Sequence, residues 1–475
     1  MKFPLVIRNI SSITLSQLII VLSGIILISH LGTTLGPKNF GIYSSAISIY
    51  GVSIAIVDLG LSMYGIRYIA SKKAATLNLI KKITRIKIFL AILVIAFSGI
   101  IFLYINPESI FVAICWLFFT SLIPYAFNLE WVFTGLEKME IRAFLRTITS
   151  IGVLLLCIFF IHFQNDIIWV PIIYFIIASI VAIVSLILTH LLSEKPFFET
   201  GVLLEDKTLI ISSFPIGLTQ ILSLFLINAD LIVLAFFISP ENLGEYAAVS
   251  RILSTLISII GMIFIPLFPA FCRKSRDYRI DHENILEFVI VFIFALSIPI
   301  ICCVELFTPS LISILYSSHY FRSIMIMQIL IWYVPIAIMI TILSWFVLSK
   351  NEDNSYLQFV IFMITQLVIF MIIGTNLCGI KGTAFSVVIS YVISIFILLE
   401  WVKNHLGSNL KRIIQFITVF ICLGFCCTTI SINLETSMVY VVISVIFIYS
   451  IFILKYSLIR FNDIRTHIRQ IFFQQ

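Results

Sequence analysis

The feature that most limits how this sequence can fold is a succession of apolar segments, each about 20 residues long, from Ser11 to about Leu458. Because a bilayer core of about 30 Å needs roughly 20 helical residues to cross it, each segment is a predicted membrane-spanning helix. The composition agrees, since 11% of the residues are charged against about 25% in soluble domains. The sequence therefore predicts an all-α, polytopic membrane protein.

The positions of these segments predict about fourteen transmembrane helices. In chain order, they cover residues 11–31, 40–66, 86–105, 109–134, 147–163, 167–192, 209–239, 246–271, 285–308, 323–349, 356–376, 383–402, 413–431 and 438–454. No small-residue cleavage site follows the first segment, so we interpret it as a membrane helix rather than a signal peptide.

The lysines and arginines predict the orientation, because short loops rich in these residues stay on the cytoplasmic side. If the N-terminus is cytoplasmic, 26 of the 30 cations fall in cytoplasmic loops and tails. The others are Lys38, Arg322 and Lys381 outside, and Arg251 within a span. We expect both termini in the cytoplasm, and we interpret the net charge of +7 as this bias plus attraction to membrane lipids, not as nucleic-acid binding.

The sequence contains none of the motifs that would indicate a catalytic or nucleotide-binding domain. GxxxxGK[ST] and HExxH are absent, no loop is much longer than about 20 residues, and the nine cysteines show no CxxC spacing or paired histidines. We therefore expect a carrier rather than an enzyme, with no metal site and no cofactor. A coupling ion, H⁺ or Na⁺, would supply energy.

A repeat predicts the architecture. Residues 35–49 read LGPKNFGIYSSAISI, and 203 residues later residues 238–252 read ISPENLGEYAAVSRI. Pro and Gly stop a helix and turn the chain, and Tyr suits the membrane interface. Because six spans separate the two copies, the copies face the same way, which indicates two parallel six-helix bundles rather than an inverted repeat.

This repeat predicts four regions of the chain. They are an N-terminal six-helix bundle at 1–192, a cytoplasmic linker at 193–208, a C-terminal six-helix bundle at 209–402, and two additional transmembrane helices with a cytoplasmic tail at 403–475. Two bundles that rock about a central cavity would allow alternating access.

Several motifs together resemble the Wzx-type O-antigen flippases, a family of polysaccharide biosynthesis membrane proteins. They are Leu35-Gly-Pro-Lys-Asn-Phe-Gly-Ile-Tyr43, Asp58-Leu-Gly-Leu-Ser62, Arg67-Tyr-Ile-Ala70, Glu130-Trp-Val-Phe-Thr-Gly-Leu-Glu-Lys-Met139, and Asp230 followed by Pro240 and Gly244-Glu-Tyr246. The resemblance implies membership of the multidrug/oligosaccharidyl-lipid/polysaccharide (MOP) exporter superfamily and a bacterial inner-membrane location. It also implies a lipid-linked oligosaccharide, carried on undecaprenyl diphosphate, as substrate, with a polysaccharide polymerase and chain-length proteins as partners.

Charged residues inside the predicted spans are functional candidates, because charge within a membrane is costly and usually faces an interior or a partner. They are Asp58, Glu130, Asp230, Arg251 and Glu305. Arg251 is the only cation that we place well inside a span, and a guanidinium suits phosphate oxygens. Two interpretations of Arg251 stay open, a contact to the substrate diphosphate and an ion pair with Asp230.

The other predicted substrate-binding residues each have a competing structural role. Asp58 would line the cavity or take part in packing, and Arg67 would bind substrate or anchor a helix at the interface. Glu130 lies beside a charged loop, so a solvated salt-bridge network competes with a role in transport. Asn228 suits either sugar hydroxyls or interhelical hydrogen bonds.

Two alternative functions stay open. A multidrug cation antiporter of the same superfamily would also have two six-helix bundles, but it would need acidic cavity residues for the ion and the cationic drug. An integral-membrane polysaccharide polymerase would act on the same lipid-linked sugars, and the short outside loops disfavour it.

Overall fold

The computed structural model describes residues 3–72, 77–105, 109–193, 206–264, 282–316, 318–350 and 353–406, with residues 414, 415, 417 and 418. These residues form helices and two short 3-10 helices, with no strand among them, which confirms the all-α fold class. Helices are expected in lipid, because each one satisfies its own backbone hydrogen bonds. The last two predicted spans, 413–431 and 438–454, lie almost wholly outside the described residues.

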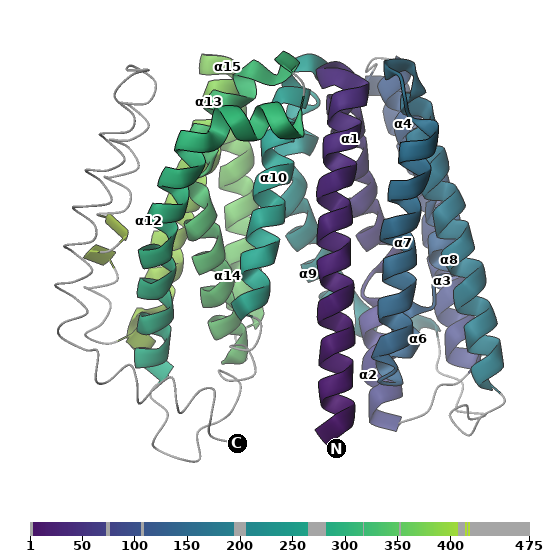
Figure 1. Ribbon diagram of the computed structural model, residues 1–475. Helices are drawn as coiled ribbons and strands as arrows, with labels where there is room; N and C mark the ends of the chain where they lie inside the picture. Colours follow the sequence, from purple (N-terminus) through teal and green to yellow (C-terminus); the bar gives the residue numbers. More distant parts are fainter. Residues whose placement is uncertain are drawn as a thin grey trace. The chain divides into compact units, whose positions relative to one another are not determined.

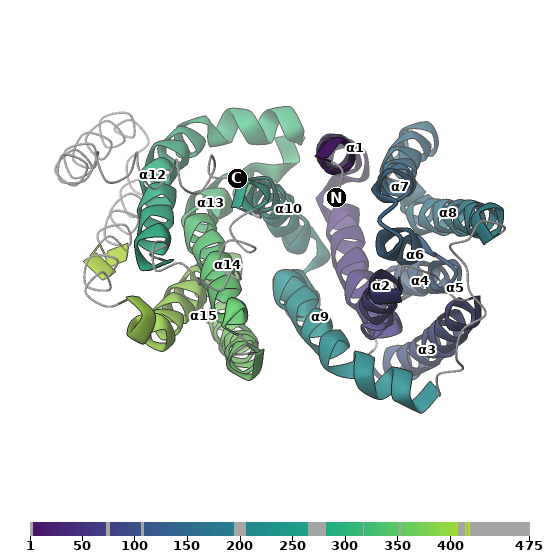
Figure 2. The ribbon, with the colours of Figure 1, turned by 90° about the horizontal axis from the view of Figure 1, so that it is seen from below.

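The chain divides into two compact units, of which the first comprises Met1–Ala248 and Leu315–His319. Its helices are α1 (Phe3–Asp58), α2 (Leu61–Lys72), α3 (Leu77–Ile105), α4 (Ser109–Thr120), α5 (Leu122–Ala126), α6 (Glu130–Gly135), α7 (Met139–Phe160), η1 (Gln164–Ile168), α8 (Trp169–Ser193), α9 (Asp206–Leu234) and the start of α10 (Pro240–Phe264). Helix α9 packs against α1 and α2 and belongs to this unit (Figure 1 and Figure 2).

The second unit comprises Val249–Ile314 and Tyr320–Gln475. Its described helices are the rest of α10, α12 (His282–Leu315), α13 (Phe321–Leu330), α14 (Tyr333–Ser349) and α15 (Asp353–Leu406). Within it, the buried carboxylate of Glu305 accepts a 2.8 Å hydrogen bond from the indole of Trp332. These compact units are not the predicted regions 1–192, 193–208, 209–402 and 403–475, and that division stays a prediction.

Among the described residues, seven helices are long and apolar enough to cross a membrane, and the bent pair α13 and α14, joined at 44°, would make an eighth span. Two of the seven, within α1 and α15, contain a non-helical break, at Gly36 and at Cys378–Gly379. At 1.5 Å per residue, each is about twice as long as a bilayer core is thick, so each break separates two crossings. The count of fourteen stays a prediction.

The break in α1 lies where the repeat motif predicts a turn. Gly36 has a φ of 71°, in the left-handed region that glycine adopts most easily, and Pro37 opens the following helix. The same motif contains a close backbone contact with its second copy. A Cβ atom at Gly244 would lie 1.8 Å from the carbonyl oxygen of Pro37, and one at Gly41 would lie 2.2 Å from that of Pro240. The two copies of the repeat therefore pack reciprocally on each other.

Two predicted spans are interrupted in the structure. The span at 40–66 ends its first helix at Asp58, because Leu59 and Gly60 both have a positive φ, 43° and 75°. The span at 109–134 is divided into α4, α5 and α6. Both interruptions place polar side chains inside the first unit. A continuous helix at either position would have placed these side chains elsewhere.

Candidate functional site

A cavity of about 500 Å³ lies in the first unit at these interruptions. Seven helices contribute to its wall, α1, α2, α3, α5, α6, α7 and α9. Its lining residues are Ile54, Ala55, Asp58, Ser62, Ile66, Lys87, Tyr125, Asn128, Glu130, Trp131, Thr134, Arg142, Arg146, Thr219, Gln220, Ser223 and Leu224. The lining contains three cations and two carboxylates together with neutral hydroxyl and amide groups, an unusual set for a helical membrane protein.

At one part of the lining, Asp58 and Lys87 form a buried ion pair. The ammonium nitrogen Nζ of Lys87 lies 2.6 Å from Oδ1 of Asp58, and the two side chains are 2% and 9% exposed. Ser62 connects them, since its hydroxyl donates to Asp58 at 2.5 Å and accepts from Lys87 at 2.7 Å. Lys87 also lies 5.6 Å from the ring centroid of Tyr125, a cation–π distance. The donors and acceptors of this group therefore largely satisfy one another.

Lys87 corrects the prediction that Arg251 is the only cation well inside a span. The sequence interpretation started the third span at residue 86 and assigned Lys87 to the cytoplasmic loop. The structure starts α3 at Leu77, which puts Lys87 well inside the helix with its side chain turned to the cavity. The sequence did not predict this earlier start of the helix, because the cations Lys81, Lys82 and Arg85 are typical of a cytoplasmic loop.

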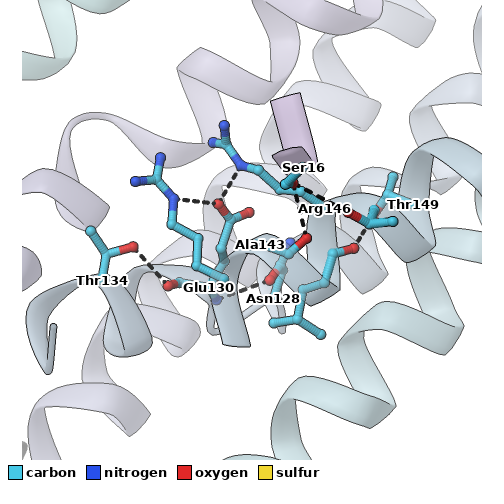
Figure 3. Close-up of polar contacts among 10 residues, drawn as sticks. Ser16, Asn128, Glu130, Thr134, Ala143, Arg146 and Thr149 are labelled. Atoms are coloured by element: carbon cyan, nitrogen blue, oxygen red, sulfur yellow. Dashed lines mark hydrogen bonds and ion pairs between the residues drawn. The ribbon is translucent and has the colours of Figure 1, made fainter. Parts of the chain in front are cut away.

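A second charged group in the lining is centred on Glu130, at the first residue of α6. Its Oε1 accepts hydrogen bonds from Nε of Arg142 at 3.1 Å and from Nε of Arg146 at 2.5 Å (Figure 3). The backbone N–H of Glu130 donates to the side chain of Asn128 at 3.0 Å, which fixes the start of the helix. The three charged side chains are 22%, 31% and 47% exposed, so solvent reaches this group.

The helix that carries the two arginines is tied to α1 by small polar side chains. The hydroxyl of Ser16 donates to the carbonyl of Ala143 at 3.2 Å and accepts from Thr147 at the same distance. Further along, Ser23 and Ser150 share a 2.5 Å hydrogen bond. Small residues of this kind let membrane helices approach closely. Helix α7 therefore holds Arg142 and Arg146 on a fixed support, one helical turn apart.

Helix α9 completes the wall with the neutral side chains of Thr219, Gln220 and Ser223. It is held at its N-terminus, where Asp206 pairs with Lys82 at 3.3 Å and with Arg85. Nearer the cavity, a Cβ atom at Gly217 would lie 2.3 Å from the carbonyl carbon of Leu59. This contact brings α9 onto the turn that follows Asp58 and closes that side of the cavity.

Of the six predicted substrate-binding residues, the structure brings Asp58 and Glu130 together in the cavity lining. Arg67 lies exposed on α2, outside the lining. Asn228 is half-buried on α9, and its amide donates to the carbonyl of Leu224 in its own helix at 2.9 Å.

Asp230 and Arg251, whose ion pair was one of the two interpretations of Arg251, are assigned to different compact units. Both side chains are half-buried. The Oδ1 atom of Asp230 accepts from the backbone N–H of Leu231 at 2.8 Å. The roles of all six residues stay predictions.

Three cations of the cavity were not predicted as site residues, namely Lys87, Arg142 and Arg146. Arg142 and Arg146 do carry a sequence signal, because a spacing of four places both on the same face of a helix. Lys87 carries no sequence signal that distinguishes it from the cations just before it in the chain. Within the described part of the chain, no cluster of three or more His, Cys, Asp or Glu residues is arranged to hold a metal ion.

Two comparisons of sequence bear on the function. The sequence profile of the family described as "Polysaccharide biosynthesis protein" matches residues 6–275. A curated protein of Escherichia coli (strain K12), named "Putative O-antigen transporter", is 24% identical over an alignment of 250 residues that covers 50% of this chain and 58% of that protein. The match therefore spans less than two thirds of the relative's length.

Two solved structures share the fold. One is described as "Lipid II flippase MurJ, inward closed conformation" and matches with a TM-score of 0.68 at 13% identity, covering 96% of this chain and 100% of that one. The other is an inward-facing multidrug resistance MATE family transporter of the MOP superfamily, with a TM-score of 0.62 at 15% identity, covering 83% of this chain and 96% of that one. At these identities, the likeness concerns the fold alone.

Proposed function

This chain belongs to the polysaccharide biosynthesis protein family, and we propose that it is a flippase for an undecaprenyl-diphosphate-linked oligosaccharide, an O-antigen or similar repeat unit. It would move this lipid from the cytoplasmic to the outer leaflet of the bacterial inner membrane, by alternating access of the two predicted six-helix bundles. It would make and break no covalent bond. The observation that carries the proposal is the polar, net cationic cavity inside a multi-pass membrane protein.

The chemistry of the substrate matches this lining. A lipid-linked oligosaccharide combines an anionic diphosphate and a hydroxylated glycan, neither of which crosses hydrocarbon unaided, with a polyprenyl tail that stays in lipid. The cavity offers cations for the diphosphate, and it offers hydroxyl and amide groups such as Thr134, Gln220 and Ser223 for the sugar hydroxyls. A volume of about 500 Å³ accommodates a headgroup portion rather than a long polymer.

The proposal extends to energy and partners. Energy would come from an ion gradient, H⁺ or Na⁺, or from consumption of the product outside by a polysaccharide polymerase with its chain-length proteins. Three carboxylates are the first to examine as ion carriers, namely Asp58, Asp230 and Glu305. Asp58 pairs with the cation Lys87, whereas the carboxylate of Glu305 accepts a hydrogen bond from the neutral indole of Trp332.

A multidrug cation antiporter is the second candidate, because a MATE transporter shares the fold. The charge of the cavity lining disfavours an antiporter. Lys87, Arg142 and Arg146 outnumber Asp58 and Glu130, and each carboxylate already faces a cation. A cationic drug would meet repulsion there, whereas an anionic headgroup would meet attraction.

The direct test is reconstitution into sealed vesicles with a labelled lipid-linked oligosaccharide, following the accessibility of the glycan from the opposite face. The flippase proposal expects accessibility to rise with protein present, without a change in glycan length. Unchanged accessibility with folded protein would contradict the proposal, and lengthened glycans would indicate the polymerase instead. Protein-free vesicles and vesicles with an unrelated membrane protein are the controls.

The proposed orientation, with both termini cytoplasmic, is tested separately by reporter fusions. Fusions after Asn106, Asp166 and Asn242 should report an outside location. Fusions after Lys73, Arg276 and Asn351 should report the cytoplasm. Any exchange between these two sets would contradict the orientation and the parallel arrangement of the repeat.

A further inference from the structure

The Glu130 group differs from an ordinary salt bridge in how its arginines are used. A strong pair of an arginine and a carboxylate forms two parallel N–H···O bonds. Here both arginines donate Nε to the same atom, Oε1 of Glu130, at 3.1 and 2.5 Å. Figure 3 shows the terminal nitrogens of Arg146 turned away from Glu130. Within the described part of the chain, neither guanidinium makes a further ion pair or hydrogen bond through these nitrogens.

The charge of this group is also incomplete. Among the residues that the structure describes, two guanidinium groups pair with one carboxylate, which leaves this group with an excess of one positive charge. Both arginines line the cavity and are 31% and 47% exposed, so an anion in the cavity can reach them. Because Arg142 and Arg146 lie one turn apart on α7, their free ends present two adjacent forks of N–H donors.

A second group with the same ingredients lies elsewhere in the first unit and serves as a reference. Asp206 also faces two cations, Lys82 and Arg85. There, however, Arg85 uses a terminal Nη nitrogen, and none of the three residues lines the cavity. The Asp206 group therefore joins α3 to α9 outside the cavity lining, whereas the Glu130 group presents both arginines to the cavity.

We infer that Arg142 and Arg146 form a diphosphate-binding site, and that Glu130 is an internal anion that occupies part of this site until the substrate displaces it. Two adjacent phosphoryl groups match two adjacent guanidinium forks, whereas one carboxylate engages only their Nε atoms. Displacement of Glu130 costs little, because a partly exposed ion pair is weak. The inference rests on the proposed function for the source of the diphosphate, a lipid headgroup.

Removing the charge of Glu130 should strengthen the binding of pyrophosphate rather than weaken it. If Glu130 competes with the ligand, then Glu130→Gln should bind pyrophosphate more tightly, by about 5- to 10-fold, which corresponds to the loss of one weak ion pair at each guanidinium. Transport by the same variant should be slower, because the site no longer helps to release its ligand. If Glu130 only positioned the arginines, its removal would instead weaken binding.

The experiment measures binding to the purified full-length protein in detergent by isothermal titration. The probes are inorganic pyrophosphate, farnesyl diphosphate and orthophosphate. The variants are Glu130→Gln, the double variant Arg142→Gln with Arg146→Gln, and the double variant Arg142→Lys with Arg146→Lys, which keeps both charges but loses the forks. Asp206→Asn is the matched control, since it removes the same charge from a carboxylate that also faces two cations.

The inference expects tighter binding of pyrophosphate in Glu130→Gln, at least a 10-fold loss in the glutamine double variant, a smaller loss in the lysine double variant, and no change in Asp206→Asn. Absence of pyrophosphate binding by the unmodified protein would overturn it. So would weaker or unchanged binding in Glu130→Gln, or an equal gain in Asp206→Asn, which would indicate a bulk charge effect.

Two further outcomes separate the site from the proposed function. Normal transport of lipid-linked oligosaccharide by the glutamine double variant would overturn the site and leave the flippase proposal intact. The expected binding pattern without any transport would support the site and contradict the flippase proposal. Farnesyl diphosphate should bind at least as well as pyrophosphate, whereas binding of pyrophosphate alone would point to a free diphosphate and overturn the lipid source.

Discussion

The two charged groups in the cavity, Asp58 with Lys87 and Glu130 with Arg142 and Arg146, are built from the same chemistry but differ in what their donors do. The ammonium of Lys87 donates to Asp58 and Ser62, and the side chains of Lys87 and Asp58 are almost fully buried. Each arginine donates one N–H to Glu130, and both arginine side chains are partly exposed. The first group is therefore arranged to hold helices together, and the second is arranged to exchange partners.

The largest expected effect comes from breaking the buried pair. Lys87→Met leaves Asp58 without its cation inside the protein, so we expect a loss of about 3–5 kcal/mol in the free energy of unfolding. Unfolding with SDS or heat in detergent measures the loss. The double variant with Asp58→Asn should recover most of it, because the uncompensated charge is gone.

The matched control for this change is Lys82→Met. Lys82 lies on the same helix, its side chain is 23% exposed, and it pairs with Asp206. Its loss should cost no more than about 1 kcal/mol. Equal losses for the two lysine variants would contradict the distinction between a buried and an exposed pair.

A smaller effect on stability is expected at the second group. Arg146→Gln should cost about 0–1 kcal/mol in the free energy of unfolding, because Arg146 is 47% exposed and Arg142 still faces Glu130. Its affinity for pyrophosphate should nevertheless fall by about 10-fold, the effect of one lost charge-assisted contact. Both quantities are measured on one preparation. A loss of stability as large as that of Lys87→Met would assign the arginine to packing.

The smallest expected effect is the response to salt. Between about 0.1 M and 1 M salt, the Debye length shortens from about 10 Å to about 3 Å, which screens exposed charges far more than buried ones. Pyrophosphate affinity should fall by about 3- to 10-fold over this range. The stability difference between the unmodified protein and Lys87→Met should stay constant. A buried pair that weakens with salt as strongly as the arginine site would remove the contrast between the two groups.

Local signals in the sequence predicted much of the helical architecture. Gly36 and Pro37 act on their own backbone, so the turn after the first span was predicted and is confirmed. The gap between the predicted spans 356–376 and 383–402 contains the break at Cys378 and Gly379, which is also confirmed. The repeat was visible as well, but its reciprocal contact through Gly41 and Gly244 was not, because a backbone approach leaves no mark on hydropathy.

The interruptions that create the cavity were not predicted. The segment 109–134 does contain polar residues at the ends of α4 and α5, Thr120 with Ser121 and Asn128 with Glu130, but a few polar residues also occur within continuous membrane helices, so they did not predict the breaks. Leu59 takes a positive φ that an isolated leucine disfavours, so the end of α1 at Asp58 depends on packing, including the contact with Gly217. A lining drawn from seven helices is a tertiary property, and single residues such as Lys87 acquire their role only there.

The central claim is that the headgroup of the lipid-linked oligosaccharide occupies the cavity of the first unit, and photo-crosslinking tests it most directly. A p-benzoylphenylalanine at Gln220, in the cavity lining, is compared with one at Phe97, which is 60% exposed on α3. In membranes with labelled substrate, position 220 should crosslink saturably, and excess unlabelled substrate should compete with this crosslink. The crosslink at position 220 should disappear in the double variant Arg142→Gln with Arg146→Gln. Any crosslink at position 97 should not saturate. Transport without a saturable crosslink at position 220 would contradict the account.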